Sequence, residues 1–465
     1  MSEESKSLVV ARQRKEILKR SKVDLDATMR PAVEVVEEET VKKKAPTPEQ
    51  FFRTAMHGET PSVPGAEVCC ETFHGFLSAI NRITPKGSGD EPPITQVKIK
   101  YVPGDTPKIF LEAHGTNVWT AVAMDVKPRG KKTFIALLPL KRTISVLNVL
   151  RASHKTVLVG AAEQRFLIGP YSIGYGGPVE EFGSPPTMLD TKGQAILPRA
   201  GIEDICSSVA WARSTDLSYP SLHGILLDFE PWTDLDAKPE PMERIVLTAV
   251  AMNGYQMNVL RMPQVPVRMV EGGVCSMPPT ITVPAGFFYY LQSVVEKNLT
   301  SLEIGEKQIT AMGEDYMVIA DVAMKGGGRP GGTSEKLSKW RTVDVNYSGY
   351  WLVDRDEMIS ALNGVVEIPF GNQVIINIDA KSEELKLFRS AGGMNYQRQI
   401  QARRFKGPSI VNVTVNPQSL LNAARSCKGG LVRLGFTHDL ASQSGAAITV
   451  MGEDENFKSV LMPVN

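Results

Sequence analysis

The stretch VPAGFFYYLQSVVEKN (283–298), followed by TSLEIGEKQITAMGEDYMVIAD (300–321), contains the pattern that decides the fold. A proline stands near the start of the first segment, and its apolar residues recur at three- and four-residue spacing, which predicts a helix with one buried face. The second segment alternates with period two around Gly305, which predicts a pair of antiparallel strands joined by a tight turn. Together they predict a helix followed by a β-hairpin.

This pattern is an internal repeat. Six segments share a strand end, a polar or proline residue, an apolar-periodic helix and a β-rich run, namely 68–83, 138–153, 197–214, 283–298, 353–367 and 415–430. Ile144, Leu147 and Leu150, for example, fall on one helical stripe. The run 374–392 repeats the hairpin pattern, with its turn expected near 380–383. Two such units in each of three domains predict an α+β architecture, with the helices gathered on one face of antiparallel sheets.

Changes in composition divide the chain. Residues 1–48 carry alternating basic and acidic blocks and predict a disordered charged arm, with a short helix over 8–20. This arm is either a solvated tail or a segment that touches DNA or a partner. Stretches rich in Gly, Pro and Ser at 174–186 and 325–340 read as linkers, and they predict three domains over 49–186, 187–330 and 340–465.

The overall composition excludes several classes of protein. The 465 residues include 52 basic and 51 acidic side chains, a net charge of +1, which excludes a uniformly basic nucleic-acid binder but allows one basic face. Five cysteines, at positions 69, 70, 206, 275 and 427, show no metal-ligand spacing and predict reduced, mostly buried thiols in a cytosolic protein. No apolar run has the length of a signal peptide or a membrane span.

No motif predicts catalysis or a cofactor. The glycine-rich GGGRPGGTS lacks the lysine of a phosphate-binding loop, and His438-Asp439 has no nucleophile motif beside it. The sequence therefore predicts a protein that is not an enzyme. A hydrolase or transferase without a recognisable motif remains the rival class.

Three stretches are similar to the bacterial DNA sliding clamps, the beta subunit of the replicative DNA polymerase III. They are 411–465, which ends in LMPVN, the pair YPSLHGILLDFE (219–230) and IVLTAVAMNGYQMNVLRMP (245–263), and ITVPAGFFYYLQSVVEK (281–297). The resemblance covers roughly 66–465 and rests on the order of these motifs. The family's terminal arginine is Asn465 here, and its Thr-Asp-Gly-His-Arg pattern is replaced by MNGYQ (252–256). These departures and the long arm indicate a divergent member, and a phage or another mobile element is one source consistent with them.

The resemblance implies a processivity factor: a ring in the cytoplasm, on the nucleoid, that encircles double-stranded DNA without reading its sequence. Two protomers would join head to tail, and a clamp loader and a DNA polymerase would be partners. The strand near 368–370 is a candidate for the edge at which protomers meet. The alternative function is a clamp-fold recruitment or structural module that no longer slides on DNA.

Basic residues on the polar sides of the repeat helices are the expected DNA contacts. Helices that line a hole with Lys and Arg attract phosphates without reading bases. The candidates are Arg82, Lys141, Arg142, Arg151, Arg213, Lys297, Arg425 and Lys428.

The resemblance also implies an apolar cleft for partner peptides between domains 2 and 3. Methionine side chains adapt to varied partners, and a glycine lets a ligand backbone come close. The matching positions are Leu222, Met252, Gly254, Met257, Leu440, Ser442, Met462, Pro463 and Val464.

Overall fold

A computed structural model of the chain describes most residues beyond position 64. The described residues are 65–83, 96–115, 117–162, 165–187, 191–214, 222–233, 243–265, 267–268, 280–295, 299–305, 307–322, 340–343, 349–368, 373–379, 383–405, 410–436 and 447–464. The arm predicted over 1–48 lies outside them, as does most of the linker predicted over 325–340.

One structural unit occurs six times in the described chain: a strand, a helix and three further strands. We call each consecutive pair of units a module. In module 1 the first unit is β1 (Gly65–Cys69), α3 (Cys70–Ile83), β2 (Gln96–Val102), β3 (Lys108–His114) and β4 (Val118–Asp125). The second is β6 (Phe134–Pro139), α4 (Leu140–Leu150), β7 (Thr156–Ala162), β8 (Arg165–Ile168) and β9 (Tyr171–Gly174), and the short elements are β5 (Lys127–Pro128) and the 3-10 turn η1 (Val179–Phe182).

Module 2 repeats this plan with one irregular helix. Its first unit is β10 (Gly193–Pro198), α5 (Arg199–Asp204), the π-helical turn η2 (Ile205–Val209), the 3-10 turn η3 (Ala210–Ala212), β11 (Gly224–Thr233), β12 (Glu243–Met252) and β13 (Gln256–Val265). Its second unit is β15 (Ile281–Pro284), α6 (Ala285–Val294), β16 (Leu299–Ile304), β17 (Gln308–Met312) and β18 (Tyr316–Asp321), and β14 (Val267–Arg268) is an extra short strand.

Module 3 follows the single helical turn α8 (Trp340–Val343). Its first unit is β19 (Tyr350–Asp354), α9 (Arg355–Val366), β20 (Val374–Asp379), β21 (Glu384–Ala391) and β22 (Met394–Arg404). Its second unit is β23 (Ile410–Val415), α10 (Pro417–Ser426), β24 (Leu431–Phe436), β25 (Ile448–Met451) and β26 (Phe457–Leu461).

Both junctions between modules follow the same rule. The last strand of the first unit in one module pairs antiparallel with the last strand of the second unit in the next: β4 with β18, and β13 with β26. These pairings build a nine-stranded sheet, β14-β10-β16-β17-β18-β4-β3-β2-β6, and a twelve-stranded sheet, β15-β11-β12-β13-β26-β25-β24-β19-β22-β21-β20-β23. The remaining sheet, β5-β1-β7-β8-β9, stays within module 1.

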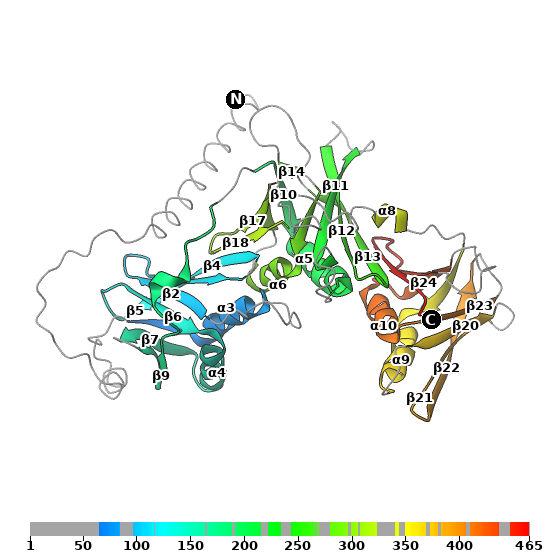
Figure 1. Ribbon diagram of the computed structural model, residues 1–465, viewed down its shortest axis with the longest axis horizontal. Coiled ribbons are helices and arrows are strands. Elements are labelled where there is room, and N and C mark those ends of the chain that lie inside the picture. The colour runs from blue at the N-terminus through cyan, green and yellow to red at the C-terminus, as the bar shows by residue number, and fades with distance from the viewer. Residues whose placement is uncertain are drawn as a thin grey trace, which may run out of the picture.

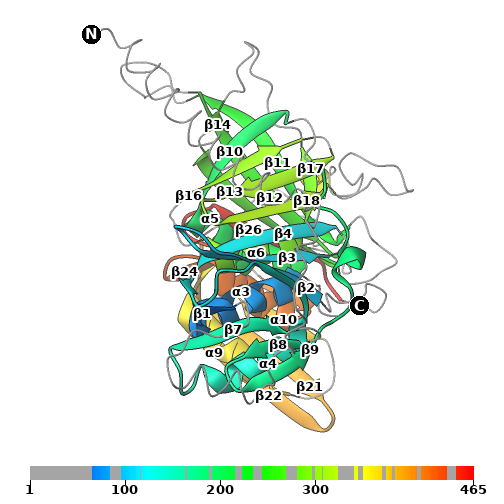
Figure 2. The ribbon, with the colours of Figure 1, turned by 90° about the vertical axis from the view of Figure 1, so that its left-hand side faces the viewer.

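The three modules form an arc (Figure 1). Helices α3, α6, α5, α10 and α9 follow its concave side, and the sheets lie outside them. Strand β9 lies at the lower end of module 1, and the β21–β22 hairpin lies at the lower end of module 3. Figure 2 shows the strands of module 2 continuing into β4 and β3 of module 1 as one stack. The predicted α+β class, with helices on one face of antiparallel sheets, is confirmed.

All six predicted helices are present, but the third is not a regular α-helix. Its π-helical turn η2 frees carbonyl groups from the usual helical hydrogen bonds. The Ser208 carbonyl accepts from Asn258 Nδ2 at 2.6 Å, and the Ser207 carbonyl accepts from Ser426 Oγ of α10 at 3.4 Å. The irregularity therefore satisfies side chains from a neighbouring strand and from module 3, which the apolar spacing of the sequence could not predict.

The strand predictions were right in one region and wrong in part in another. The run 374–392 forms β20 and β21, as predicted. The run 300–321 forms three strands, β16, β17 and β18, where a pair was predicted. Gly305 N donates to the Gln308 carbonyl at 2.9 Å in the predicted turn, and Gly313 N donates to the Tyr316 carbonyl at 2.9 Å in a second one. The second turn separates β17 from β18, which the alternation alone had indicated to be one long strand.

Two further predictions concern cysteines and membranes. Cys70, Cys206 and Cys427 are buried free thiols, Cys69 is an exposed one, and Cys275 lies outside the described residues. Burial raises the pKa of Cys206 and of Cys427 to about 12, so both thiols stay protonated at neutral pH. None of the described helices is long and apolar enough to cross a membrane.

Candidate functional site

An apolar cluster stands apart from the main core, on the sheet formed by β11, β12, β13 and β26. It unites four predicted cleft residues, Leu222, Met252, Met257 and Met462, with six others: Leu226, Val250, Val259, Trp340, Ala447 and Val460. Met257 lies directly opposite Val460 across the β13–β26 pairing. We call these ten residues the junction cluster, because modules 2 and 3 both contribute to it.

Strand alternation explains why the cluster is separate. Met257 and Val259 of β13 face it, whereas Asn258, between them, faces the helices. Asn258 is fully buried, and its Oδ1 accepts from Ser459 Oγ of β26 at 2.7 Å and from Gln256 Nε2 at 2.9 Å. The β13–β26 pair therefore carries an apolar cluster on one face and a satisfied polar network on the other, which fixes the two modules relative to each other.

Gly254 lies in the turn before β13. Its φ is +92°, a conformation that favours glycine, and no atom of the chain lies within 4 Å of a Cβ built on it. Asn253 Oδ1 accepts from the backbone N–H groups of Tyr255 and Gln256, at 3.0 Å each. Tyr255 is 74% exposed, so the turn forms an open rim beside the junction cluster.

The chain end is held at two points. Met462 N donates to the Tyr255 carbonyl at 2.8 Å, and Val464 N donates to the Thr414 carbonyl of β23 at 2.9 Å. Met462 packs against the junction cluster, whereas Pro463 and Val464 are half-buried beyond it. The structure thus brings four of the nine predicted cleft residues together and places Gly254, Pro463 and Val464 beside them. Leu440 and Ser442 lie outside the described residues.

The sequence interpretation missed Trp340 and Arg341. Trp340 is only 3% exposed although it belongs to a single helical turn. Its Nε1 donates to Asp228 Oδ2 at 3.0 Å, and Arg341 Nη2 lies 2.7 Å from the same oxygen. Arg341 also pairs with Glu230 and lies with its guanidinium 4.7 Å from the centre of the Trp340 ring. The signal available in the sequence was a tryptophan at the end of a Gly-rich linker, where large apolar residues are unusual.

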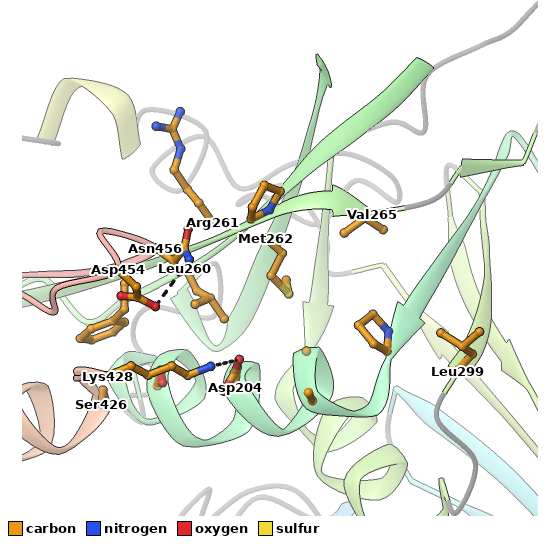
Figure 3. A pocket seen from close by; sticks show the side chains of 16 residues that line it. Asp204, Leu260, Arg261, Met262, Val265, Leu299, Ser426, Lys428, Asp454 and Asn456 are labelled. Carbon is orange, nitrogen blue, oxygen red and sulfur yellow. Dashed lines mark hydrogen bonds and ion pairs between the residues drawn. The ribbon is translucent and has the colours of Figure 1, made fainter. Parts of the chain in front are cut away.

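A pocket of about 300 Å³ lies at the opposite end of the β13–β26 pair (Figure 3). α5, β13 and the turn before β26 line it, together with Ser426 and Lys428. Lys428 Nζ pairs with Asp204 Oδ2 at 2.6 Å across the pocket, whereas Arg261 points away from it. The pocket therefore holds an ion pair between modules 2 and 3.

The predicted DNA contacts fall into two groups. Lys141 and Arg142 are exposed on α4, and their side chains have no ion-pair partner among the described residues. The others that the structure describes are engaged. Arg82 Nη1 donates to Ser293 Oγ of α6 at 3.1 Å, Arg425 Nη2 to Asn363 Oδ1 at 2.8 Å, and Arg213 Nη1 to the Ala210 carbonyl at 3.1 Å. Lys428 pairs with Asp204, and Lys297 lies outside the described residues.

Arg151 lies between two neighbours on α3. Its Nη1 is 3.7 Å from Glu71 Oε1 and 3.2 Å from His74 Nδ1. Burial and the charge of Arg151 lower the pKa of His74, so this imidazole stays neutral at pH 7 and adds no charge. Arg151 is nevertheless 39% exposed at its side chain, and an exposed pair of this kind can exchange for a phosphate at little cost.

Charge is unevenly distributed over the helices of the concave side. α4 exposes Lys141 and Arg142, α6 contains no charged residue, and α9 exposes Asp356 and Glu357 in its first turn. The other helices add exposed basic residues at Arg199 of α5 and Arg425 of α10, so basic character follows only part of the concave side. Within the described part of the chain, no group of three or more His, Cys, Asp or Glu side chains could hold a metal ion.

The chain has the fold of the bacterial sliding clamps. Its structure is similar to the beta subunit of DNA polymerase III from Thermotoga maritima, with a TM-score of 0.66, 12% identity, and coverage of 86% of this chain and 99% of that one. It is also similar to the sliding clamp of Bartonella birtlesii bound to griselimycin, with a TM-score of 0.65, 16% identity and coverage of 86% and 99%.

A third similar structure is the beta clamp of Helicobacter pylori bound to a DNA ligase peptide, with a TM-score of 0.62, 11% identity and coverage of 86% and 99%. No protein-family model and no curated protein matches the sequence. The predicted resemblance is therefore a shared fold at low sequence identity, as expected of a divergent clamp.

Proposed function

We propose that the chain is a processivity factor: a ring-shaped sliding clamp, not an enzyme, that encircles double-stranded DNA and tethers a polymerase and other replication proteins. The three modules would be its three domains. The pairing rule of the two junctions carries this proposal, because it leaves one complementary pair of strands unused, at opposite ends of the arc. The shared fold supports it.

Ring closure follows from that rule. β4 pairs with β18 and β13 with β26, so the next pairing in the series joins β22 to β9 of a second copy. Residues 394–401 of β22 pair only with β21, and β9 pairs only with β8, within the described chain. Such unpaired edges invite a further strand. A head-to-tail dimer would use both. Of the strand predicted near 368–370, Ile368 lies in a bend after α9, and the rest of the segment is outside the described residues.

The helices support the same closure. At the first junction the start of α6 abuts the end of α3: a Cβ on Gly286 would lie 2.5 Å from the Ile83 carbonyl oxygen. Among the six repeat helices that the structure describes, α4 and α9 are the two without such a counterpart in another module. In the ring the start of α4, with Lys141 and Arg142, would meet the end of α9 of the second copy, where Glu367 is exposed. Opposite charges would then meet across the closing contact.

Module 1 would make much of the DNA contact. Lys141 and Arg142 are exposed on α4 with no ion-pair partner among the described residues, and Arg151, at the other end of that helix, is 39% exposed at its side chain. These residues would attract phosphates without reading bases, which is what sliding requires. We place the ring on the nucleoid in the cytoplasm, with a clamp loader to open it.

The junction cluster would be the cleft for partner peptides. Methionines provide adaptable walls, and the open rim at Gly254 leaves room for a ligand backbone. The clamp of Helicobacter pylori was solved with a DNA ligase peptide, which supports peptide binding by this fold.

A recruitment module that does not slide is the second candidate. The lack of charge on α6 and the exposed acidic residues in the first turn of α9 favour it, because helices that line a hole for DNA should carry basic residues. Sedimentation with mass determination separates the two functions. A dimer that co-sediments with nicked circular DNA supports the clamp. A protein that is a monomer at micromolar concentration and does not co-sediment with the DNA supports the recruitment module.

A further inference from the structure

Trp340 differs from most other members of the junction cluster because it comes from the segment between modules 2 and 3 and not from a strand. Trp340 is 3% exposed and packs with the methionines and aliphatic residues of that cluster. We propose that Trp340 and Arg341 act as an internal ligand of the cleft, and that the partners which displace them carry an aromatic residue followed by a basic one. The proposal rests on the proposed function, because it takes the junction cluster to be the partner cleft.

The burial of the cluster supports an internal ligand. Met257 is 2% exposed and Val460 is 1% exposed, so neither is accessible to a peptide in the present arrangement. Both lie on strands fixed by the β13–β26 ladder. Trp340 is instead held in a four-residue turn. Displacement of the indole would therefore disturb less backbone pairing than displacement of Met257 or Val460.

The polar contacts of the pair define the chemistry of a competing partner. Asp228 is 5% exposed, and its carboxylate accepts from Trp340 Nε1, from Thr280 Oγ1 at 3.0 Å and from Arg341. A buried carboxylate that loses its donors is strongly destabilised. A ligand that replaces the indole must therefore bring an apolar ring to fill the cluster and a cation to meet Asp228 and Glu230. An aromatic residue followed by Arg or Lys supplies both.

The contacts of the pair are of a kind that a ligand can replace. Arg341 is 50% exposed at its side chain, so its cation can be exchanged for that of a ligand, whereas Asp228 is only 7% exposed and needs a donor in either state. The indole contributes a buried apolar ring and one further donor. A competing peptide that buries an equivalent ring regains the same contacts, so the internal ligand lowers partner affinity and selects against peptides without the aromatic–basic pair.

The test uses the chain's own sequence as the probe. The fluorescein-labelled peptide SKWRTV, which copies residues 338–343, is titrated by fluorescence anisotropy into the full-length protein and into Trp340→Ala. The variant leaves an open cavity, so it should bind the peptide at least tenfold more tightly than the unmodified chain. SKARTV should not bind, and SKWETV should bind at least fivefold more weakly than SKWRTV. Equal or weaker binding by Trp340→Ala, or equal binding of the control peptides, would overturn the proposal.

A second measurement covers the case in which Trp340→Ala fails to fold, as judged by circular dichroism. Acrylamide quenching of tryptophan fluorescence is followed in the unmodified chain and in Trp340→Phe, with saturating SKFRTV. The difference between the two proteins reports Trp340 alone. Displacement predicts that the peptide raises quenching of this residue, whereas unchanged or reduced quenching would identify Trp340 as a fixed wall and overturn the proposal. The DNA co-sedimentation described above does not involve Trp340, so failure of the clamp function would be recognised separately.

Discussion

Met257 of β13 lies opposite Val460 of β26, in a strand pairing that joins two modules distant in the sequence. The same pairing directs Asn258 and Ser459 to the other face, where they hydrogen-bond at 2.7 Å. One pair of strands therefore fixes the geometry between modules and forms the floor of the predicted cleft. This double role makes the β13–β26 junction the best place to separate stability from partner binding.

Replacing Asn258 with Ala should lower stability without affecting the cleft. The substitution leaves the Ser208 carbonyl of the π-helical turn without its 2.6 Å donor in a buried site. We expect a loss of about 2 kcal/mol in the free energy of unfolding, the usual order for an orphaned buried polar group. Urea denaturation measures it, with Asn412→Ala, at an exposed position of β23, as the control. An unchanged midpoint would show that the network does not hold the junction.

Deleting residues 462–465 should weaken partner binding strongly but preserve the fold. The deletion removes Met462 from the junction cluster and breaks two backbone hydrogen bonds, but it removes no strand. Hot-spot anchors of this kind are often worth about 2 kcal/mol or more each, so polymerase affinity should fall at least tenfold. Asn412→Ala, at an exposed position of β23 outside the predicted cleft, is the control. Since the family's terminal Arg is Asn465 here, a standard bacterial clamp-binding peptide should bind weakly even to the full chain. A folded truncation that binds its polymerase as tightly as the full chain would refute the cleft assignment.

Changing Arg142, Arg151 and Arg425 together to Glu should weaken DNA contact. All three side chains are accessible on the concave helices, and exposed charge changes usually cost little stability. Each phosphate contact that is lost should reduce the slope of log affinity against log salt by about 0.9. Binding is measured at salt concentrations from about 50 to about 200 mM, over which the slope of log affinity against log salt can be determined. If the slope is the same for the variant and the unmodified chain, these residues do not face DNA.

The contact proposed to close the ring, between the start of α4 and the end of α9 of the second copy, predicts that a charge reversal can be rescued by the opposite reversal. Glu367→Lys should repel Lys141 and Arg142 of the second copy and raise the dimer dissociation constant at least tenfold, about 1.4 kcal/mol. Combining it with Lys141→Glu and Arg142→Glu should restore the dimer. Asp356→Lys, at the other end of α9, is the matched control. Analytical ultracentrifugation gives the constants, and a triple variant no tighter than Glu367→Lys alone would exclude this pairing.

The sequence predicted the repeating unit but not how the units join. Apolar spacing located all six helices, because each buries one stripe against a sheet, as Leu147 and Leu150 do in α4. It could not reveal the second turn, which begins at Gly313, because the alternation of the flanking residues reads as one continuous strand. The π-helical turn was not predicted either, because Asn258, the side chain that donates to its Ser208 carbonyl, is far away in the sequence.

The candidate site was predicted in part. Leu222, Met252, Met257 and Met462 meet as expected, since the resemblance fixed their order along the strands. Trp340 was missed because the residues that it contacts, Asp228 among them, are distant in the sequence and spacing cannot identify them. Arg82, Arg425 and Lys428 each contact a side chain of another element, which the spacing of charges along the helices could not predict.

The most direct test of the ring is retention on nicked circular DNA. The protein is loaded with its clamp loader and passed through a gel-filtration column at high salt, and the DNA is then cut once with a restriction enzyme. A closed ring is held by topology, so it should remain on the circle and be released when the DNA becomes linear. Protein that leaves the intact circle at high salt, or that stays equally on linear DNA, would contradict a sliding clamp.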